Sequence, residues 1–321
     1  MKNFDKKQFN GLNILVLGDI ILDHFIFGTS NRISPEAPVP IVEVTSEDYM
    51  LGGAANVANN ISELGANCTL IGSIGHDLSG ERIQSLSEEK KINFLPFLTN
   101  KKTTTKSRVF IDHHQISRLD YEDKSEVELL KNKKFMDLIK QQIIKNDSVV
   151  ISDYCKGFLS EIFVTKIIEF AKSNNKTVFV DTKKTNLDCF LNSDYVTPNV
   201  SELSKIVKYD VKNSQTAIKE ACQIVFNKFQ IQNLVITRSS KGAGLLNRNS
   251  SIFLKNKAIK VFDVTGAGDS FISIFSLLKT INFSDETSLK ISTAVGSIAV
   301  SKPGTYAVKM DEIIKFISDE K

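Results

Sequence analysis

From Asp147 onward the sequence alternates short apolar runs with amphipathic stretches, and this alternation restricts the fold more than any other feature. An apolar run at 148–152 is followed by a stretch at 160–173 whose apolar residues recur every three or four positions, and then by an apolar run at 177–180. Strands that alternate with helices build a mainly parallel sheet with helices on both faces. The sequence therefore predicts a doubly wound α/β fold.

Each apolar run of this pattern ends in polar residues. Ligands of doubly wound sheets bind beyond the carboxyl ends of the strands, so we expect these residues to lie around one crevice. A dinucleotide site after the first run, at 14–17, is the alternative, but no G-x-G-x-x-G string follows that run. The polar residues are Asp19 and Asp23, Asp153 with Tyr154 and Lys156, Asp181 with Lys183, Thr197 with Asn199, and Thr237 with Arg238 and Ser239.

A loop with the sequence DVTGAGDS, at 263–270, lies between a strand-like run at 260–262 and a helical run at 271–278. Its two glycines allow the backbone to approach a ligand closely, and the N–H groups of the first helical turn can bind an anion. A carboxylate at Asp269 would repel a phosphoryl group unless it accepts a proton from the attacking hydroxyl group. An aspartate that merely caps a tight turn is the alternative, which fits an isolated G-x-G-D string better than this longer one.

A second glycine-rich stretch, GGAANVANNISELG at 52–65, predicts a helix that ends at Gly65. Small residues at its start, Gly52 and Gly53, permit close approach of a polar ligand, and Asn56 can both donate to and accept from sugar hydroxyl groups. A helix packed tightly on the sheet is the alternative interpretation.

Two extended stretches outside the alternating pattern predict a second, smaller sheet. Residues 24–48 have no helical period and contain three prolines, and residues 103–120 are typical of a hairpin with its turn at 112–115. Strand residues are expected at Val39, Ile41, Val42 and Val44 in the first stretch. We therefore predict one domain over residues 1–321, with these two stretches inserted in it as a β-sheet lid.

Asn199 and Glu202 begin a predicted helix and lie on the same face of its first turn. A carboxylate in this place suits Mg²⁺ carried by nucleotide phosphates and held through water, because Mg²⁺ keeps much of its hydration shell. An acidic residue favoured by the helix dipole explains the spacing equally well. Farther along, Gly242 and strand-like runs at 244–247 and 251–254 predict an antiparallel edge of the sheet.

Composition excludes several classes of protein. Lys and Arg number 41 against 37 Asp and Glu and are scattered, so nothing requires a nucleic acid or an anionic membrane as partner. The four cysteines are far apart without a C-x-x-C pair, which disfavours a zinc site and a disulfide framework. No apolar run approaches the ~20 residues that span a bilayer. We expect a cytoplasmic protein.

Taken together, these motifs resemble the ribokinase-like, phosphofructokinase-B type carbohydrate kinases, and in particular the D-glycero-β-D-manno-heptose 7-phosphate kinases. The resemblance covers nearly the whole chain; the loop at 263–270 is typical of the superfamily, whereas RISPEAPVP at 32–40 is more specific to the subgroup. It implies phosphorylation of the anomeric O1 by ATP, in ADP-heptose synthesis for the lipopolysaccharide core. Such kinases occur alone or as the N-terminal half of a bifunctional kinase and adenylyltransferase, and no His-x-Gly-His string of an adenylyltransferase occurs in this sequence.

The resemblance also implies roles for single residues. Asp269 is the base that activates O1, and Gly266, Ala267 and Gly268 supply the N–H groups of the anion hole. The sugar is expected at Asp19, Asp23, Gly52, Gly53 and Asn56. The nucleotide is expected at Asn199, Glu202, Thr237, Ser239, Gly242, Asp263 and Thr265, with Mg²⁺ near Glu202. A monovalent cation is an additional cofactor that the resemblance leaves open.

A phosphorylated heptose also needs a cationic patch for its far-end phosphate. Arg108, Arg118, Lys156 and Lys183 lie on the predicted hairpin or at strand ends, and ordinary solvated charges are the alternative for each of them. An isolated small sheet with one apolar face rarely stays exposed, so we expect a homodimer formed through the lid, as in the resembled kinases.

The sequence departs from the subgroup at two places. Ser292 stands where the subgroup tends to have an asparagine near the adenine, and DTKK at 181–184 replaces an Asp-Pro-Lys-Gly pattern. The first departure leaves the details of adenine recognition open. Two other functions also stay open: phosphorylation of a different sugar by the same kind of kinase, and a regulator that binds a sugar or a nucleotide without catalysis.

Overall fold

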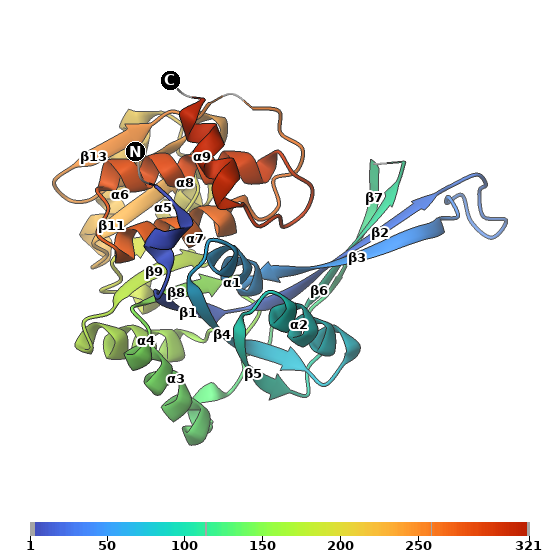
Figure 1. Cartoon of the computed structure of the whole chain (residues 1–321), viewed down its shortest axis with the longest axis horizontal. Helices are drawn as coiled ribbons and strands as arrows, with labels where there is room; N and C mark the ends of the chain where they lie inside the picture. The colour runs from blue at the N-terminus through green and yellow to red at the C-terminus, as the bar shows by residue number, and fades with distance from the viewer. Residues whose placement is uncertain (1–3, 113, 258, 320–321) are drawn as a thin grey trace.

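A computed structural model describes residues 4–112, 114–257 and 259–319. Its centre is a nine-stranded sheet in the order β13-β12-β11-β10-β9-β8-β1-β4-β5 (Figure 1). Neighbouring strands from β11 to β5 are parallel, while β12 and β13 form an antiparallel edge. The strands are β1 (Asn13–Gly18), β4 (Asn67–Gly75), β5 (Asn93–Thr99), β8 (Ser148–Asp153), β9 (Thr177–Thr182), β10 (Tyr195–Val196), β11 (Asn233–Thr237), β12 (Ala243–Leu246) and β13 (Ser251–Leu254). The predicted doubly wound, mainly parallel sheet is confirmed.

Helices cover both faces of this sheet because its central strands are buried on both sides. In β1, Ile14 and Val16 belong to an apolar cluster with α1, α7, α8 and α9, whereas Leu15 and Leu17 belong to a second cluster with α3 to α6. The helices are α1 (Ala54–Glu63), α2 (Leu78–Glu89), α3 (Lys133–Lys145), α4 (Glu161–Ser173), α5 (Val200–Val207), α6 (Gln215–Lys228), α7 (Ala267–Thr280), α8 (Asp285–Val300) and α9 (Met310–Ser318). Within the described residues, no helix is long and apolar enough to cross a membrane.

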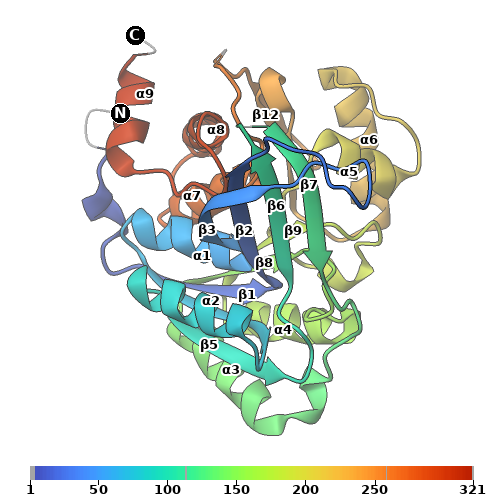
Figure 2. The same ribbon diagram turned by 90° about the vertical axis from the view of Figure 1, so that its right-hand side faces the viewer.

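A separate four-stranded sheet in the order β3-β2-β6-β7 extends away from the main body (Figures 1 and 2). It consists of β2 (Ile20–Thr29), β3 (Glu43–Gly53), β6 (Thr105–Ile111) and β7 (His114–Tyr121). The parallel pairing of β2 with β6 joins the two stretches that the sequence analysis proposed to meet. His113, in the predicted turn, lies outside the described residues.

Two strand predictions were wrong. Residues 39, 41 and 42 precede β3, which begins only at Glu43. Pro35, Pro38 and Pro40 lack N–H groups for a ladder, and the segment forms the loop between β2 and β3. The run at 260–262 is also not a strand; the Phe262 N–H instead donates to the carbonyl group of Val300 at the end of α8, at 2.7 Å.

Candidate active site

Asp269 lies in the first turn of α7, and the loop before this helix determines its position. Gly266 is the N-cap residue and has a φ of 75°, a left-handed conformation that favours glycine. A Cβ atom on Gly266 would also come within 2.8 Å of the Asn56 amide nitrogen. The first turn of α7 therefore presents its backbone N–H groups and the Asp269 carboxylate at the same end of the helix.

Two side chains from other elements hold the Asp269 carboxylate. Asn56 on α1 donates to Oδ2 at 2.8 Å, and the Tyr154 hydroxyl, just after β8, donates to Oδ1 at 2.7 Å. Asp269 is only 2% exposed, and burial raises its pKa to about 7, although the two hydrogen bonds oppose this rise. A carboxyl group with a pKa near neutral pH is suited to accept a proton from an alcohol.

Asp19 accepts hydrogen bonds from the backbone of the loop after β8. Its Oδ2 accepts from the backbone N–H groups of Tyr154 at 2.8 Å and Lys156 at 3.0 Å, and its Oδ1 accepts from Phe158 N–H at 3.2 Å. Burial raises the pKa of Asp19 to about 6. Both carboxylate oxygens thus bind the loop after β8. The sequence predicts a sugar contact for Asp19, and it does not show that the backbone of a distant loop binds the same carboxylate.

Asp23 and Arg108 form a buried ion pair in the lid, with Oδ1 and Nη1 2.5 Å apart. A Cβ atom on Gly52 would lie 2.3 Å from the other Asp23 oxygen, so glycine at this position leaves space for the carboxylate. Gly53 has a φ of 57° where the chain passes from β3 into α1. These residues lie near the end of the lid from which α1 begins, and Arg108 is paired with Asp23.

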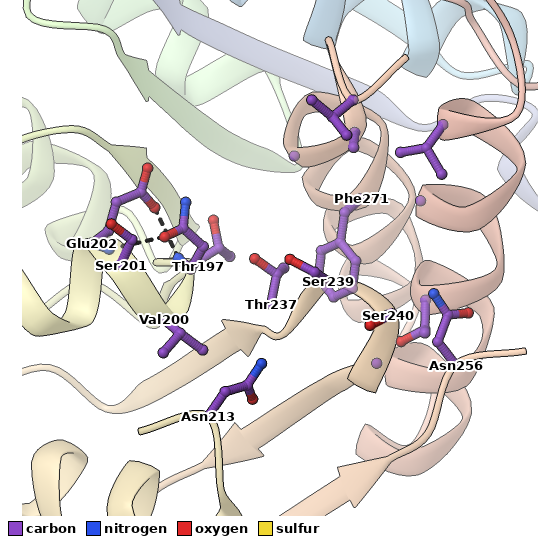
Figure 3. Close-up of a pocket in the computed structure, with 18 of the residues that line it drawn as sticks. Thr197, Val200, Ser201, Glu202, Asn213, Thr237, Ser239, Ser240, Asn256 and Phe271 are labelled. Atoms are coloured by element: carbon purple, nitrogen blue, oxygen red, sulfur yellow. Dashed lines mark hydrogen bonds between the residues drawn. The ribbon is translucent and has the colours of Figure 1, made fainter. Parts of the chain in front are cut away.

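A cavity of about 950 Å³ runs from Tyr154 and Asp181 along α5 to α8. Figure 3 shows Val200, Ser201 and Glu202 on one wall and Phe271 and Asn256 on the opposite wall. The predicted site residues among its lining are Lys183, Asn199, Glu202, Thr237, Ser239, Gly242, Gly266, Ala267 and Gly268. The loop before α7 thus forms one end of an elongated cavity with mixed polar and apolar walls.

Asn199 and Glu202 form a capping box at the start of α5. The Asn199 side chain accepts from Glu202 N–H at 2.9 Å, and Glu202 Oε2 accepts from Asn199 N–H at 2.8 Å. The other carboxylate oxygen, Oε1, lies 2.7 Å from Lys183 Nζ, which is also 3.7 Å from Asp181. Two carboxylates that face the cavity make an all-oxygen donor set that fits Mg²⁺.

Two residues with a predicted nucleotide role, and the departure from the subgroup at Ser292, lie outside the lining of the cavity. Asp263 accepts from Thr265 N–H at 2.9 Å and from Gly304 N–H at 3.1 Å, so it ties the loop before α7 to the loop before α9. Neither Asp263 nor Thr265 lines the cavity. Ser292 is fully buried in α8, and its neighbour Thr293 lines the cavity instead.

The predicted cationic residues are all paired with carboxylates. Arg118 Nε bonds to Asp120 at 2.7 Å, and Lys156 bonds to Glu122. Lys106 on β6, which was not predicted, forms no ion pair within the described part of the chain. Its ammonium group lies 5.5 Å from the ring centre of Tyr154, and burial lowers its pKa.

Sequence reasoning also gave no role to Tyr154 and Asp181, although both stand in the polar strand ends that it singled out. Asp181 is 4% exposed, and burial raises its pKa. A signal was available in each case, because a strand-end side chain points into the crevice. The sequence does not show which side chains Tyr154 and Asp181 contact.

The fold and this site define a kinase of small molecules, and the family comparison agrees. The chain matches the pfkB family carbohydrate kinase model over residues 12–312 and belongs to that family. It is therefore a carbohydrate kinase.

Individual proteins similar to this chain give further detail. The bifunctional protein HldE of Helicobacter pylori (strain HPAG1) is 34% identical over 94% of this chain, and that of Haemophilus influenzae (strain PittEE) is 37% identical over 95%. The chain spans only 65% and 63% of the lengths of these relatives.

Solved structures agree with the fold. Phosphofructokinase-2 from Escherichia coli, in complex with substrates and products, superposes with a TM-score of 0.78 at 22% identity, covering 96% of this chain and 98% of that one. Arabidopsis thaliana ribokinase, with ribose and ATP, gives a TM-score of 0.75 at 18% identity, covering 95% and 98%. These similarities support the ribokinase-like fold.

Proposed function

We propose that this protein transfers the γ-phosphoryl group of ATP to the anomeric O1 of D-glycero-β-D-manno-heptose 7-phosphate, giving the 1,7-bisphosphate for ADP-heptose and lipopolysaccharide core synthesis. The observation that carries the proposal is the buried Asp269 carboxylate in the first turn of α7, beside N–H groups suited to a phosphoryl group. The subgroup-specific string at 32–40 and the similarity to bifunctional HldE proteins support the choice of sugar. ATP as donor places the reaction in the cytoplasm.

The proposed reaction needs one proton acceptor and one anion site. Asp269 accepts the O1 proton while O1 attacks the γ-phosphorus, the new O–P bond forms, and the bond to the β-phosphate oxygen breaks to release ADP. The backbone N–H groups of Gly266, Ala267 and Gly268 stabilise the charge on the transferred group. Asn56 holds the base at 2.8 Å and is fully buried, so its contribution is to orient the base.

The nucleotide is proposed to occupy the cavity between α5 and α8, with its phosphates toward Gly266. Glu202 and Asp181 would hold Mg²⁺, Glu202 through water, and the ion would neutralise the charge of the nucleotide phosphates. Lys183 bridges these carboxylates and supplies a positive charge at the same end of the cavity. The walls farther along, at Asn256 and Ser297, are proposed to face the adenine.

The far-end phosphate of the sugar is proposed to bind the inner face of the lid. Asp23, Lys106 and Asp120 are cross-strand neighbours on β2, β6 and β7, and Arg108 and Arg118 are neighbours two residues farther along. These residues share one face, because side chains two positions apart on a strand point the same way. We expect the phosphate to pair with Lys106, because Arg108 and Arg118 on this face already form ion pairs with Asp23 and Asp120.

The test is ADP release from ATP and Mg²⁺ with a panel of sugars, with and without K⁺. We expect kcat/KM for the heptose 7-phosphate to exceed by far the value for the heptose without phosphate, for ribose, for fructose 6-phosphate and for a nucleoside. Asp269→Asn should lower kcat by at least ~10²-fold with the KM for ATP little changed. Equal kcat/KM for both heptoses would reject the substrate but keep a sugar kinase, and ligand binding without turnover would favour a regulator.

A further inference from the structure

We propose that Tyr154 is a positioning residue that holds the Asp269 carboxylate in place for proton transfer. The inference rests on the proposed function, because it assigns Asp269 as the base. It adds a residue from the loop after β8, which binds the carboxylate oxygen that Asn56 does not bind. Its basis is the contact between the Tyr154 hydroxyl and Asp269 Oδ1 at 2.7 Å.

The two carboxylate oxygens of Asp269 are held by different elements. Asn56 on α1 binds Oδ2 and Tyr154 binds Oδ1, so the plane of the carboxylate is fixed from two sides. A carboxylate oxygen has a second lone pair, which remains for the hydroxyl group of the sugar. Removing one of the two donors would leave the base free to rotate about its side chain.

The loop that carries Tyr154 is itself anchored. Asp19 at the end of β1 accepts hydrogen bonds from the N–H groups of Tyr154, Lys156 and Phe158. Charge-assisted bonds of this kind are among the stronger ones in proteins. A path of hydrogen bonds therefore leads from β1 through Asp19 and the loop to the Tyr154 hydroxyl.

Burial and the neighbouring carboxylates keep the proton of Tyr154 on the phenol, although two nearby lysines favour the phenolate. Lys106 Nζ and Lys183 Nζ lie 5.5 Å and 5.4 Å from its ring centre on β6 and after β9. Burial, together with the carboxylates of Asp269, Asp181 and Asp23, raises the pKa of Tyr154 well above its ordinary value. The phenol therefore stays a donor over the working pH range, and it opposes the rise of the Asp269 pKa that burial causes.

The first test is the pH dependence of kcat/KM in Tyr154→Phe, which keeps the ring and removes the hydroxyl. Without this donor the Asp269 pKa should rise, so the acidic limb of the profile should move up by about one pH unit. Near pH 6.5 the variant should be roughly tenfold slower than wild type, and the deficit should shrink by pH 8.5, with the KM for ATP unchanged. Asp181 and Lys183 also face Asp269 and are present in both proteins.

Tyr306→Phe is the matched control, because its hydroxyl also donates to a carboxylate, that of Glu312 at 2.9 Å, which is not the proposed base. It should leave the acidic limb unmoved. If the acidic limb of the kcat/KM profile does not move in Tyr154→Phe, the proposal is overturned, whatever the value of kcat. A purely structural role of Tyr154 would lower activity at every pH and leave the limb in place. Tyr154→Leu replaces the phenylalanine variant if that protein does not fold.

A second measurement does not depend on activity. Carbon-13 labelling of aspartate carboxyl groups, with the Asp269 signal assigned from its loss in Asp269→Asn, gives the pKa of the base in wild type and in Tyr154→Phe. A rise in the variant supports the positioning role even if no sugar is phosphorylated, in which case the proposed function fails alone. An unchanged pKa overturns the role of Tyr154 and leaves the kinase proposal standing.

Discussion

At the scale of residues, the site places a carboxylate where burial opposes its charge. Burial raises the pKa of Asp269 to about 7, whereas an exposed aspartate has a pKa of ~3.9. The folded protein therefore binds this proton more tightly than the unfolded chain does. The free energy of unfolding should fall as the pH rises from ~4 through ~7, because the unfolded chain loses the proton first. Asp269 thus lowers stability at the pH at which it is ionised.

Asp269→Asn should therefore melt at a higher temperature than wild type at pH 8, by roughly 2 °C or more, and the difference should be much smaller at pH 5. At pH 5 the native carboxyl group is protonated and, like the amide, is a neutral group with both donor and acceptor atoms. Thermal unfolding followed by circular dichroism at both pH values measures this. Asp123→Asn is the control, since Asp123 is exposed and hydrogen bonds from Ser125 lower its pKa. A lower melting temperature for Asp269→Asn at pH 8 would contradict the argument.

Local patterns located the site residues better than they assigned contacts. The Thr-Gly-Ala-Gly-Asp string placed Asp269 at a helix start, because glycine and the free N–H groups of the first turn act within a few residues. The partners of Asp19 and Asp263 could not be read in the same way. Asp19 binds backbone more than 130 residues away, at Tyr154, and Asp263 binds Gly304. Such contacts form only in the packed fold, and local patterns in a single sequence do not reveal the two partners.

At the scale of elements, the lid face that holds Lys106, Arg108 and Arg118 is the one to which we propose that the sugar phosphate binds. Lys106→Met should raise the KM for the heptose 7-phosphate by at least ~10-fold and should change the KM for the heptose without phosphate by less than ~2-fold, because a charge-assisted bond to phosphate contributes ~1.5–3 kcal/mol. Initial-rate assays with both sugars measure this. Lys102→Met is the matched control, as Lys102 is exposed just before β6. An equal rise of KM for both sugars would place the phosphate elsewhere.

The elements themselves follow from the sequence wherever the apolar period is regular. Strands β8 and β9 and helix α4 were predicted almost to the residue, since burial on both faces leaves continuous apolar runs. The lid was predicted as two separate stretches, and β2 begins at Ile20 and β3 continues to Gly53, beyond the expected bounds. The lid face that holds Lys106 is charged, and apolar and polar residues alternate only weakly along its strands. Pairing between the strands therefore determines where each strand begins and ends.

At the scale of the whole molecule, the lid has two edge strands and exposed apolar side chains. Each of β3 and β7 pairs with only one neighbour among the described residues, and every residue of β7 is exposed. The exposed apolar residues of this region are Ile33, Val39, Val44, Ile116, Leu119 and Tyr121. Unpaired edges and apolar patches of this kind favour contact with a second copy of the chain. This supports the proposed homodimer through the lid.

The dimer makes a prediction that separates the lid from the rest of the surface. Light scattering should give twice the chain mass of 35.8 kDa at micromolar concentration. Leu119→Glu should shift the protein toward the monomer, because it places a charge in the contact, whereas Ile224→Glu, at an equally exposed residue on α6, should not. A wild-type protein that is a monomer would contradict the proposed dimer. If Ile224→Glu dissociates the dimer and Leu119→Glu does not, the interface lies at α6 and not at the lid.

If the lid pairs as proposed, Leu119→Glu should also raise the KM for the sugar more than the KM for ATP. The lid face that holds Lys106 is built on the same strands as Leu119, whereas the nucleotide cavity is not.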